Sequence, residues 1–177
     1  MPIPITESRQ VTVEPAAPAD AQAVANLLEL YSHDLSAAFS LELGPDGRFG
    51  YEKLPLYWSE ADRRFPFLFR RGSFLAGFAF VTRGSPVSDD PDVFDVAEFF
   101  VVRRHRRCGL GRQAAFQLWN RLAGRWTVRV SDENHGGCLF WASIVAEYTN
   151  GVFSETSRPD DKRRWRVFEF ENANRGA

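Results

Sequence analysis

The sequence lacks the features that mark secreted, membrane-spanning and nucleic-acid-coating proteins. Its two cysteines, Cys108 and Cys138, have no metal-ligand spacing and make no disulfide framework. No apolar run approaches the roughly 18 residues of a membrane span, and the first residues lack the basic and apolar regions of a signal peptide. The formal net charge of -1 gives no basic surplus for phosphate contacts. We therefore expect a cytoplasmic protein that binds neither membrane nor nucleic acid and holds no metal.

The residue pattern predicts one α/β domain over residues 1–177, with 1–9 as a flexible lead-in. A chain of 177 residues can bury a substantial core, and 44% hydrophobic with 25% charged residues is typical of globular proteins. Apolar periodicity distinguishes the strands from the helices. The expected strands are 10–14, 66–71, 74–82, 93–102, 126–131, 147–155 and 164–170, and the expected helices are 19–35, 111–122 and 134–145, with 54–58 as a short helix or an aromatic-rich loop.

The most informative segment is the turn 103–111, RRHRRCGLG, between a buried strand and a helix. Glycines there let backbone N–H groups converge without Cβ interference, and the N-terminus of the following helix attracts phosphate. Neighbouring arginines add charge-assisted donors. The turn therefore predicts a pyrophosphate or similar dianion bound by the backbone of 107–112. The alternative is a solvated basic turn, because the segment matches neither a P-loop nor the dinucleotide fingerprint.

This turn resembles the signature of the GNAT (N-acetyltransferase) superfamily, Gln/Arg-x-x-Gly-x-Gly/Ala. Arg106, Gly109 and Gly111 stand in its three defining positions. The preceding segment 97–101, AEFFV, is similar to the family's E-L-Y-V strand. The resemblance implies the α/β acyl-CoA N-acyltransferase fold, a mixed and mostly antiparallel sheet splayed at its fourth and fifth strands and flanked by helices.

Two further matches extend the resemblance over roughly 10–170. Glu133-Asn134 followed by Phe140-Trp141 is similar to the family's E-N-x-x-A-x-x-F-Y helix. The pieces YSHDLS, LGPDGRFGYE, PLYW and AEFF resemble a bacterial branch of predicted acetyltransferases. The resemblance therefore implies acetyl-CoA as co-substrate. The positions it assigns to the coenzyme are Phe100, Val101 and Val102 on the strand edge, Arg106, Arg107, Cys108, Gly109, Leu110, Gly111 and Arg112 around the pyrophosphate, and Asn134 at the coenzyme arm.

The chemistry needs a base, because a lysine-like amine has a pKa of about 10.4. Glu98 is the candidate, a lone carboxylate in an apolar strand where burial would raise its pKa. An edge-facing or salt-bridged, purely structural Glu98 is the alternative. The family's usual tyrosine is replaced by Trp141, whose indole cannot release a proton. Tyr148, the nearest tyrosine in sequence, is the candidate acid, on the strand expected to follow.

Acceptor recognition is expected from the first helix and the loop after it, where aromatic residues are frequent. A cationic amine could be held there by cation–π and charge contacts. The alternative for these aromatics is packing in the core or in a lid. The alternative for His33 is a structural position on the helix surface or at a helix cap. The candidates are Tyr31, His33, Asp34, Tyr57 and Trp58, with Tyr51 in the same region.

The sequence thus leaves three functions open. The first is an acetyltransferase in which an amine, of a small molecule or of a protein, attacks the thioester directly. Its expected assembly is a monomer or a homodimer. The second is a catalytically silent acyl-CoA-binding sensor or regulatory module, suggested by Trp141. The third, a nucleic-acid binder using the arginines of the turn, is disfavoured by the near-zero net charge.

Overall fold

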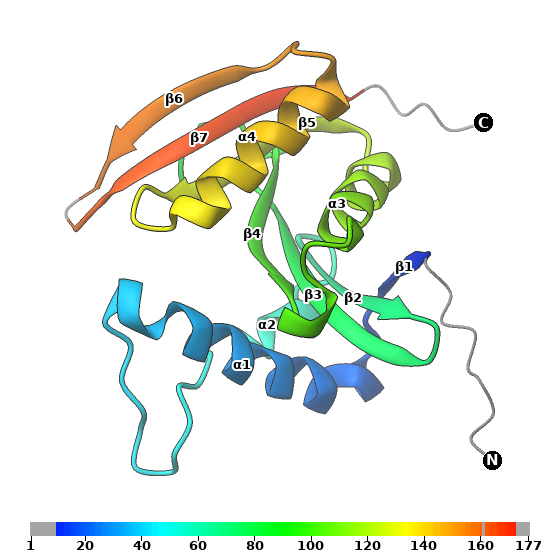
Figure 1. Ribbon diagram of the computed structural model, residues 1–177, viewed down its shortest axis with the longest axis vertical. Helices are drawn as coiled ribbons and strands as arrows, with labels where there is room; N and C mark the ends of the chain where they lie inside the picture. Colours follow the sequence, from blue (N-terminus) through cyan, green and yellow to red (C-terminus); the bar gives the residue numbers. More distant parts are fainter. Residues whose placement is uncertain (1–9, 161, 173–177) are drawn as a thin grey trace.

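The computed structural model describes residues 10–160 and 162–172, so the expected lead-in 1–9 lies outside the described residues. One sheet of seven strands runs through it in the order β1-β2-β3-β4-β5-β7-β6 (Figure 1). Every neighbouring pair is antiparallel except β4 and β5, which are parallel. The strands are β1 (Val11–Pro15), β2 (Arg64–Arg71), β3 (Phe74–Arg83), β4 (Phe94–Val101), β5 (Gly124–Ser131), β6 (Ser154–Pro159) and β7 (Arg164–Asn172).

Helices cover both faces of this sheet. Figure 1 shows α1 (Ala21–Phe39) and α2 (Leu56–Ser59) on one side, and α3 (Leu110–Arg121) and α4 (His135–Thr149) on the other. Short 3-10 turns occupy Pro18–Asp20 and Arg103–His105. None of the helices among the described residues is both long and apolar enough to span a membrane. This mixed, mostly antiparallel sheet flanked by helices is the fold class that the resemblance implies.

Two apolar cores, one on each face, fix the helices. On the first face, Val24 and Leu28 of α1 recur at helical spacing and pack with Phe78 and Phe80 of β3. On the second face, α3 and α4 bury their apolar stripes against the central strands, with Trp119 of α3 fully buried. The sheet is therefore held between helices at its centre, where β4 lies.

A β-bulge in β4 decides which face Glu98 occupies. The register pairs Val81 with Val96 and Phe80 with Glu98, so Ala97 is the extra residue. Val96 belongs to the core under α3 and α4, whereas Phe80 belongs to the core under α1. Strict alternation would put Glu98 on the face of Val96. The bulge instead turns Glu98 to the face covered by α1.

The expected strand 147–155 is wrong in its first part. Residues 147–149 are the last residues of α4, and the strand β6 begins at Ser154. The helix continues because Ile144 and Val145 are buried against the sheet. It ends where Asn150 and Gly151 take left-handed φ angles of 52° and 82°. Tyr148 and Thr149 are residues that strands favour, so the local pattern does not distinguish the end of this helix from the start of a strand.

Candidate active site

The sheet opens between β4 and β5. The two strands pair at three positions, from Phe94 with Trp126 to Val96 with Val128. Within the described chain, the β4 edge from Ala97 to Val101 has no strand partner on the β5 side. Backbone N–H and C=O groups on such an edge can pair with an extended ligand. The expected splay of the fourth and fifth strands is present.

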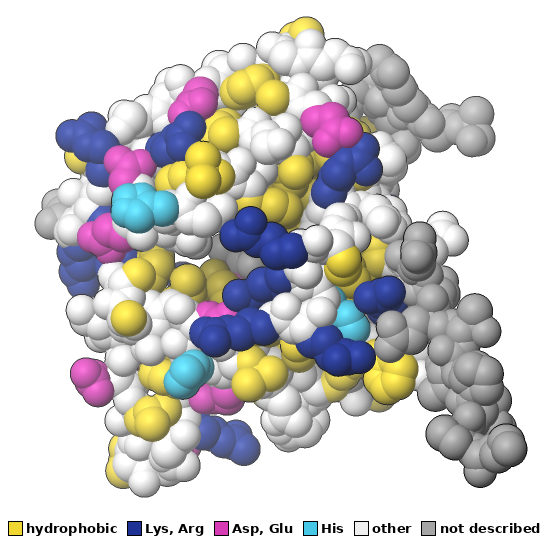
Figure 2. Space-filling view, viewed as in Figure 1, with side chains coloured by type: hydrophobic (Ala, Val, Ile, Leu, Met, Phe, Trp, Pro, Cys, Tyr) yellow, Lys and Arg dark blue, Asp and Glu magenta, His cyan; other side chains and the backbone are white. Residues whose placement is uncertain are grey.

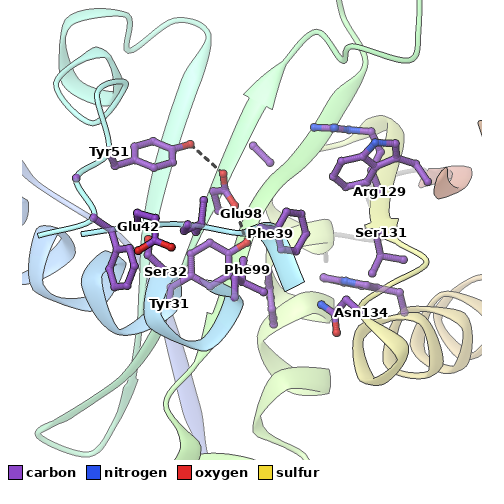
Figure 3. Close-up of a pocket in the computed structure, with 18 residues that line it drawn as sticks. Tyr31, Ser32, Phe39, Glu42, Tyr51, Glu98, Phe99, Arg129, Ser131 and Asn134 are labelled. Atoms are coloured by element: carbon purple, nitrogen blue, oxygen red, sulfur yellow. Dashed lines mark hydrogen bonds between the residues drawn. The ribbon is translucent and has the colours of Figure 1, made fainter. Parts of the chain in front are cut away.

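Glu98 lies in this opening and is held by two tyrosines. The Tyr31 hydroxyl of α1 donates to Oε2 at 2.6 Å, and the Tyr51 hydroxyl donates to Oε1 at 3.0 Å (Figure 3). Burial raises the pKa of Glu98 above its usual value, and the hydrogen bonds from both tyrosines and the charge of Arg129 oppose that rise. Burial also raises the pKa of Tyr31 and of Tyr51, and the Glu98 charge adds to both shifts. The three groups form a Tyr–Glu–Tyr unit in which Glu98 accepts both bonds.

A cavity of about 430 Å³ surrounds this unit, and we name it the Glu98 cavity. It lies between α1, the loop after α1 and the strands β4, β5 and β7 (Figure 3). Aromatic and polar side chains both contribute to its walls. The aromatic members are Tyr31, Phe39, Phe49, Tyr51, Phe99, Trp141 and Trp165, and the polar members include Ser32, Glu42, Glu98, Arg129, Ser131 and Asn134.

A second cavity, of about 610 Å³, adjoins the first, and we name it the arginine cavity. Arg103, Arg106 and Arg107 line it on one side and the start of α4 on the other. Figure 2 shows basic side chains gathered around a hollow on this face of the molecule. The two cavities meet, because both are lined by the same five residues: Tyr31, Leu35, Phe99, Asn134 and Trp141.

The N-terminus of α3 lies beside the arginine cavity. Gly109, its N-cap, has a φ of 79°, and Arg107 has a φ of 60°. The first N–H groups of a helix have no partner within it, so those after Gly109 are available to an anion. Gly111 lines the cavity, and a Cβ there would lie 3.2 Å from the Phe140 ring. Glycine at 111 therefore keeps the wall open and the backbone accessible.

Asp34 joins α1 to this turn, a role that the sequence did not indicate. Arg103 donates to Oδ1 through Nε at 2.9 Å and Nη2 at 2.7 Å, and Arg106 pairs with Oδ2. Burial raises the pKa of Asp34, but the arginine hydrogen bonds outweigh it and hold that pKa below its usual value. Arg106 also donates to the Val101 carbonyl at 2.7 Å. Asp34, expected at the acceptor, thus lines the arginine cavity and not the Glu98 cavity.

Three other expected acceptor residues also lie away from the Glu98 cavity. His33 is exposed on α1 and lines neither cavity. Tyr57 is buried and stacks on Phe80 with ring centroids 3.8 Å apart, and burial raises its pKa to about 12. Trp58 packs beside the same core and donates to the Ala16 carbonyl at 3.0 Å. Tyr57 and Trp58 therefore make the core contacts of the packing alternative, and of the five expected acceptor residues Tyr31 alone lines the Glu98 cavity.

Tyr148 is a further correction. It lies in α4 rather than on a strand, and its hydroxyl donates to Asn120 at 2.8 Å. Its ring packs on Phe116 and Trp119, and it lines neither cavity. Its hydroxyl therefore lies outside the cavity that contains Glu98. Trp141, by contrast, is buried at the junction of the two cavities.

The expected coenzyme residues divide into two groups. Phe100, Val101, Arg106, Arg107, Gly111 and Asn134 line the arginine cavity, and Asn134 also caps α4 by accepting the Gly137 N–H at 2.9 Å. The others make contacts elsewhere. Val102 donates its N–H to the Ala76 carbonyl, Cys108 donates to the His105 carbonyl, Leu110 is buried in the core and Arg112 pairs with Glu147. At Gly109, Leu110 and Arg112, an anion could therefore contact the backbone but not a side chain.

Arg129 of β5 is the residue that sequence reasoning missed. It lines the Glu98 cavity and donates to the fully buried Asp95 through Nε at 2.9 Å and Nη2 at 2.8 Å. The sequence offered one signal, an arginine between two valines in the expected strand 126–131. Among the described residues, no three His, Cys, Asp or Glu side chains gather where they could hold a metal ion.

Solved structures of other proteins share this architecture. The chain is similar over 94% of its length to an acetyltransferase from Thermus thermophilus, with a TM-score of 0.67, 20% identity and 100% of that chain covered. The fold is that of the GNAT acetyltransferases. A GNAT-family acetyltransferase from Listeria monocytogenes is matched with a TM-score of 0.62 at 13% identity, over 92% of this chain and 95% of that one.

The GNAT fold is also matched in a structure that contains the coenzyme. The yncA protein of Salmonella typhimurium, a putative acetyltransferase solved with its cofactor acetyl-CoA, has a TM-score of 0.63 and 13% identity, over 94% of this chain and 96% of that one. No protein-family model and no curated protein sequence matches the chain. At these identities the likeness establishes the fold, and the chemistry has to be argued from the site.

Proposed function

We propose that this protein is an acetyl-CoA-dependent N-acetyltransferase that moves an acetyl group to an amine by direct attack on the thioester. The observation that carries the proposal is the position of Glu98. Its carboxylate lies in a cavity that meets the arginine cavity at five shared residues. The likeness to acetyltransferases, one of them solved with acetyl-CoA, supports the same chemistry.

The residues of the arginine cavity fit coenzyme A. Its phosphates suit the N-terminus of α3, where Gly109 and Gly111 keep the backbone accessible, and the guanidinium groups beside it. Its amide-containing arm suits the β4 edge from Ala97 to Val101, with Asn134 opposite. When bound, acetyl-CoA would supply the thioester carbonyl that the amine attacks. The arginine cavity would then hold the phosphate end of acetyl-CoA, and the thioester end would lie toward the Glu98 cavity.

Glu98 would act as the base. Its carboxylate would accept the proton that the attacking nitrogen loses as the N–C bond forms and the C–S bond breaks. Tyr31 and Tyr51 hold that carboxylate in one orientation. The leaving thiolate has a pKa near 8.5, so it needs an acid less than an alkoxide would. Tyr31 lines both cavities and is bonded to Glu98, so once Glu98 is protonated the Tyr31 hydroxyl could relay that proton to the thiolate.

A catalytically silent acyl-CoA-binding module is the second candidate. It is favoured by Trp141, which cannot donate a proton where the resemblance implies a tyrosine, and by the remote position of Tyr148. Both candidates predict coenzyme binding. Turnover separates them, because a silent module would bind acetyl-CoA and release no thiol with any amine.

The experiment is a panel of amines incubated with acetyl-CoA and read by the release of free thiol. Coenzyme binding is measured in parallel as the rise in melting temperature, since a ligand of the native state stabilises it. We expect both a thermal shift and amine-dependent thiol release. A shift without release would support the silent module, and a melt unmoved by millimolar acetyl-CoA would contradict both.

A further inference from the structure

Arg129 is a partly buried cation in the wall of the Glu98 cavity. It projects from β5, and its side chain is 18% exposed while that of Asp95 is fully buried. Asp95 also accepts hydrogen bonds from Thr127 at 2.6 Å and Ser85 at 2.9 Å. This network fixes the guanidinium in one orientation, so little side-chain entropy remains to be lost when it binds a ligand.

The pairing with Asp95 uses only two of the three guanidinium nitrogens of Arg129. A guanidinium carries five N–H donors. Within the described part of the chain, the hydrogen bonds of Arg129 go from Nε and Nη2 to Asp95. Among the described residues, the two N–H groups of Nη1 and the second N–H of Nη2 have no hydrogen-bond partner, and Arg129 lines the cavity. These two nitrogens form a fork that can bind a carboxylate in bidentate fashion. Trp165 lies against the guanidinium, 5.8 Å from ring centroid to Cζ, and limits its access to water.

Glu98 and Arg129 face the same space from neighbouring strands. Figure 3 shows Glu98 on one side of the cavity and Arg129 on the other. An amine acceptor is attracted to Glu98, and a second, anionic group on the same molecule would be attracted to Arg129. Seven aromatic residues also line this cavity, and their rings can pack against an apolar side chain.

We propose that the acceptor is a small amino-carboxylate with an apolar side chain, whose amine points to Glu98 and whose carboxylate binds the free edge of Arg129. The free amino acids are the simplest members of this class. This inference rests on the proposed acetyltransferase function and narrows its acceptor. A protein lysine lacks the neighbouring free carboxylate that Arg129 would bind, so the inference favours a small molecule over a protein chain.

The first test compares matched amines in the thiol-release assay. Phenylalanine, phenylalaninamide and phenethylamine share a side chain and differ in the carboxylate, and leucine with leucinamide and isoamylamine forms a second series. We expect kcat/KM to be at least about tenfold higher for the amino acid than for either partner, the loss expected when a bidentate charge pair is removed. The amine of the amide is less basic, so a larger fraction of it is neutral and able to attack at a given pH. This difference favours the amide and therefore works against the proposal. Equal use of the three compounds in both series would overturn it.

The second test assigns the preference to Arg129. Arg129→Lys keeps the positive charge but loses the planar guanidinium that binds a carboxylate through two N–H groups. Arg125→Lys is the matched control, because Arg125 lies on the same strand and pairs with Asp90 at the surface. We expect Arg129→Lys to reduce the preference for the amino acid about tenfold, mainly through KM, and Arg125→Lys to keep it. If Arg129→Lys is poorly folded, the double variant Asp95→Asn/Arg129→Met removes both buried charges together and should lose the preference too.

A binding measurement separates this inference from the proposed function. With coenzyme A present, the amino acid should raise the melting temperature of the wild-type protein and the decarboxylated amine should not. If no amine is acetylated but this shift occurs and is lost in Arg129→Lys, the carboxylate site stands and the acetyltransferase function fails. If amines are acetylated without a preference and without the shift, the function stands and the Arg129 site is wrong.

Discussion

The hydroxyl group of Tyr31 lies 2.6 Å from Oε2 of Glu98 and joins α1 to the bulged strand β4. The two residues are 67 positions apart in the chain. Tyr31 also lines both cavities, so it lies where a coenzyme and an acceptor would meet. A single hydroxyl thus holds the candidate base and borders both candidate binding sites.

Replacing Tyr31 with phenylalanine should therefore lower turnover while leaving the coenzyme bound. A hydrogen bond to a charged group contributes about 1.5–3 kcal/mol, so a loss of roughly tenfold to a hundredfold in kcat is expected. The Tyr31 bond favours the ionised form of Glu98, so its loss should raise the pKa of Glu98 further. The rise of activity with pH should consequently move to higher pH, measured as a kcat–pH profile.

Tyr148→Phe is the control for this variant, since Tyr148 lies outside both cavities. It should leave the kcat–pH profile in place, with any effect confined to thermal stability through its bond to Asn120. A Tyr31→Phe protein with wild-type kcat and an unshifted profile would show that the Tyr31–Glu98 contact has no part in catalysis.

The glycines of the turn give a prediction about the coenzyme alone. Gly109→Val should strain a left-handed backbone at the α3 N-cap, and Gly111→Leu should collide with Phe140. Each should abolish the thermal shift with acetyl-CoA while the protein still folds cooperatively. Gly47→Val is a matched control, because Gly47 has a similar φ of 74° in a loop and lines neither cavity. Retention of the full shift in both turn variants would place the coenzyme elsewhere.

The two cysteines report on the same turn. Cys108 is exposed in it, whereas Cys138 is buried in α4. Cys108 should therefore alkylate faster than Cys138, and coenzyme A should slow its labelling by covering the adjacent backbone. The measurement is the modification rate at each thiol by mass spectrometry, with and without coenzyme A. Equal rates at Cys108 in both conditions would mean that coenzyme A does not cover this turn.

The pH dependence follows from the raised pKa of Glu98. A base acts only when ionised, and burial shifts that ionisation above the usual glutamate value of about 4.3. Activity should therefore increase with pH through a transition above that value, and fall as Glu98 is protonated below it. A kcat profile that is flat down to the usual glutamate range would contradict the assignment of Glu98 as the base.

Local sequence patterns predicted most of the fold and part of the site. The strand–turn–helix around Gly109 follows from glycine geometry and apolar periodicity, and most of the expected coenzyme residues that line the arginine cavity are near it in sequence. The β-bulge at Ala97 has no such signal, because its register depends on the partner strand β3. The face that Glu98 occupies was therefore beyond the reach of the alternation pattern.

The contacts that sequence reasoning missed join distant segments. Asp34 pairs with Arg103 and Arg106, which are 69 and 72 positions away, and no spacing rule indicates such a pair. Arg129 lines the Glu98 cavity while it pairs with the buried Asp95, and that position depends on the opening between β4 and β5. Tyr57 and Trp58 pack in the core under α1, and composition alone does not distinguish packing aromatics from binding ones.

The most direct test of the account compares the wild-type protein with Glu98→Gln in the same thiol-release assay, with acetyl-CoA and the amine panel. The amide replaces the carboxylate at nearly unchanged size but cannot accept the proton. The account predicts amine-dependent release by the wild-type protein, a rate lower by about 10²–10⁴-fold in Glu98→Gln, and the same thermal shift with acetyl-CoA in both. Equal rates across the pH range would contradict it and assign Glu98 a structural role.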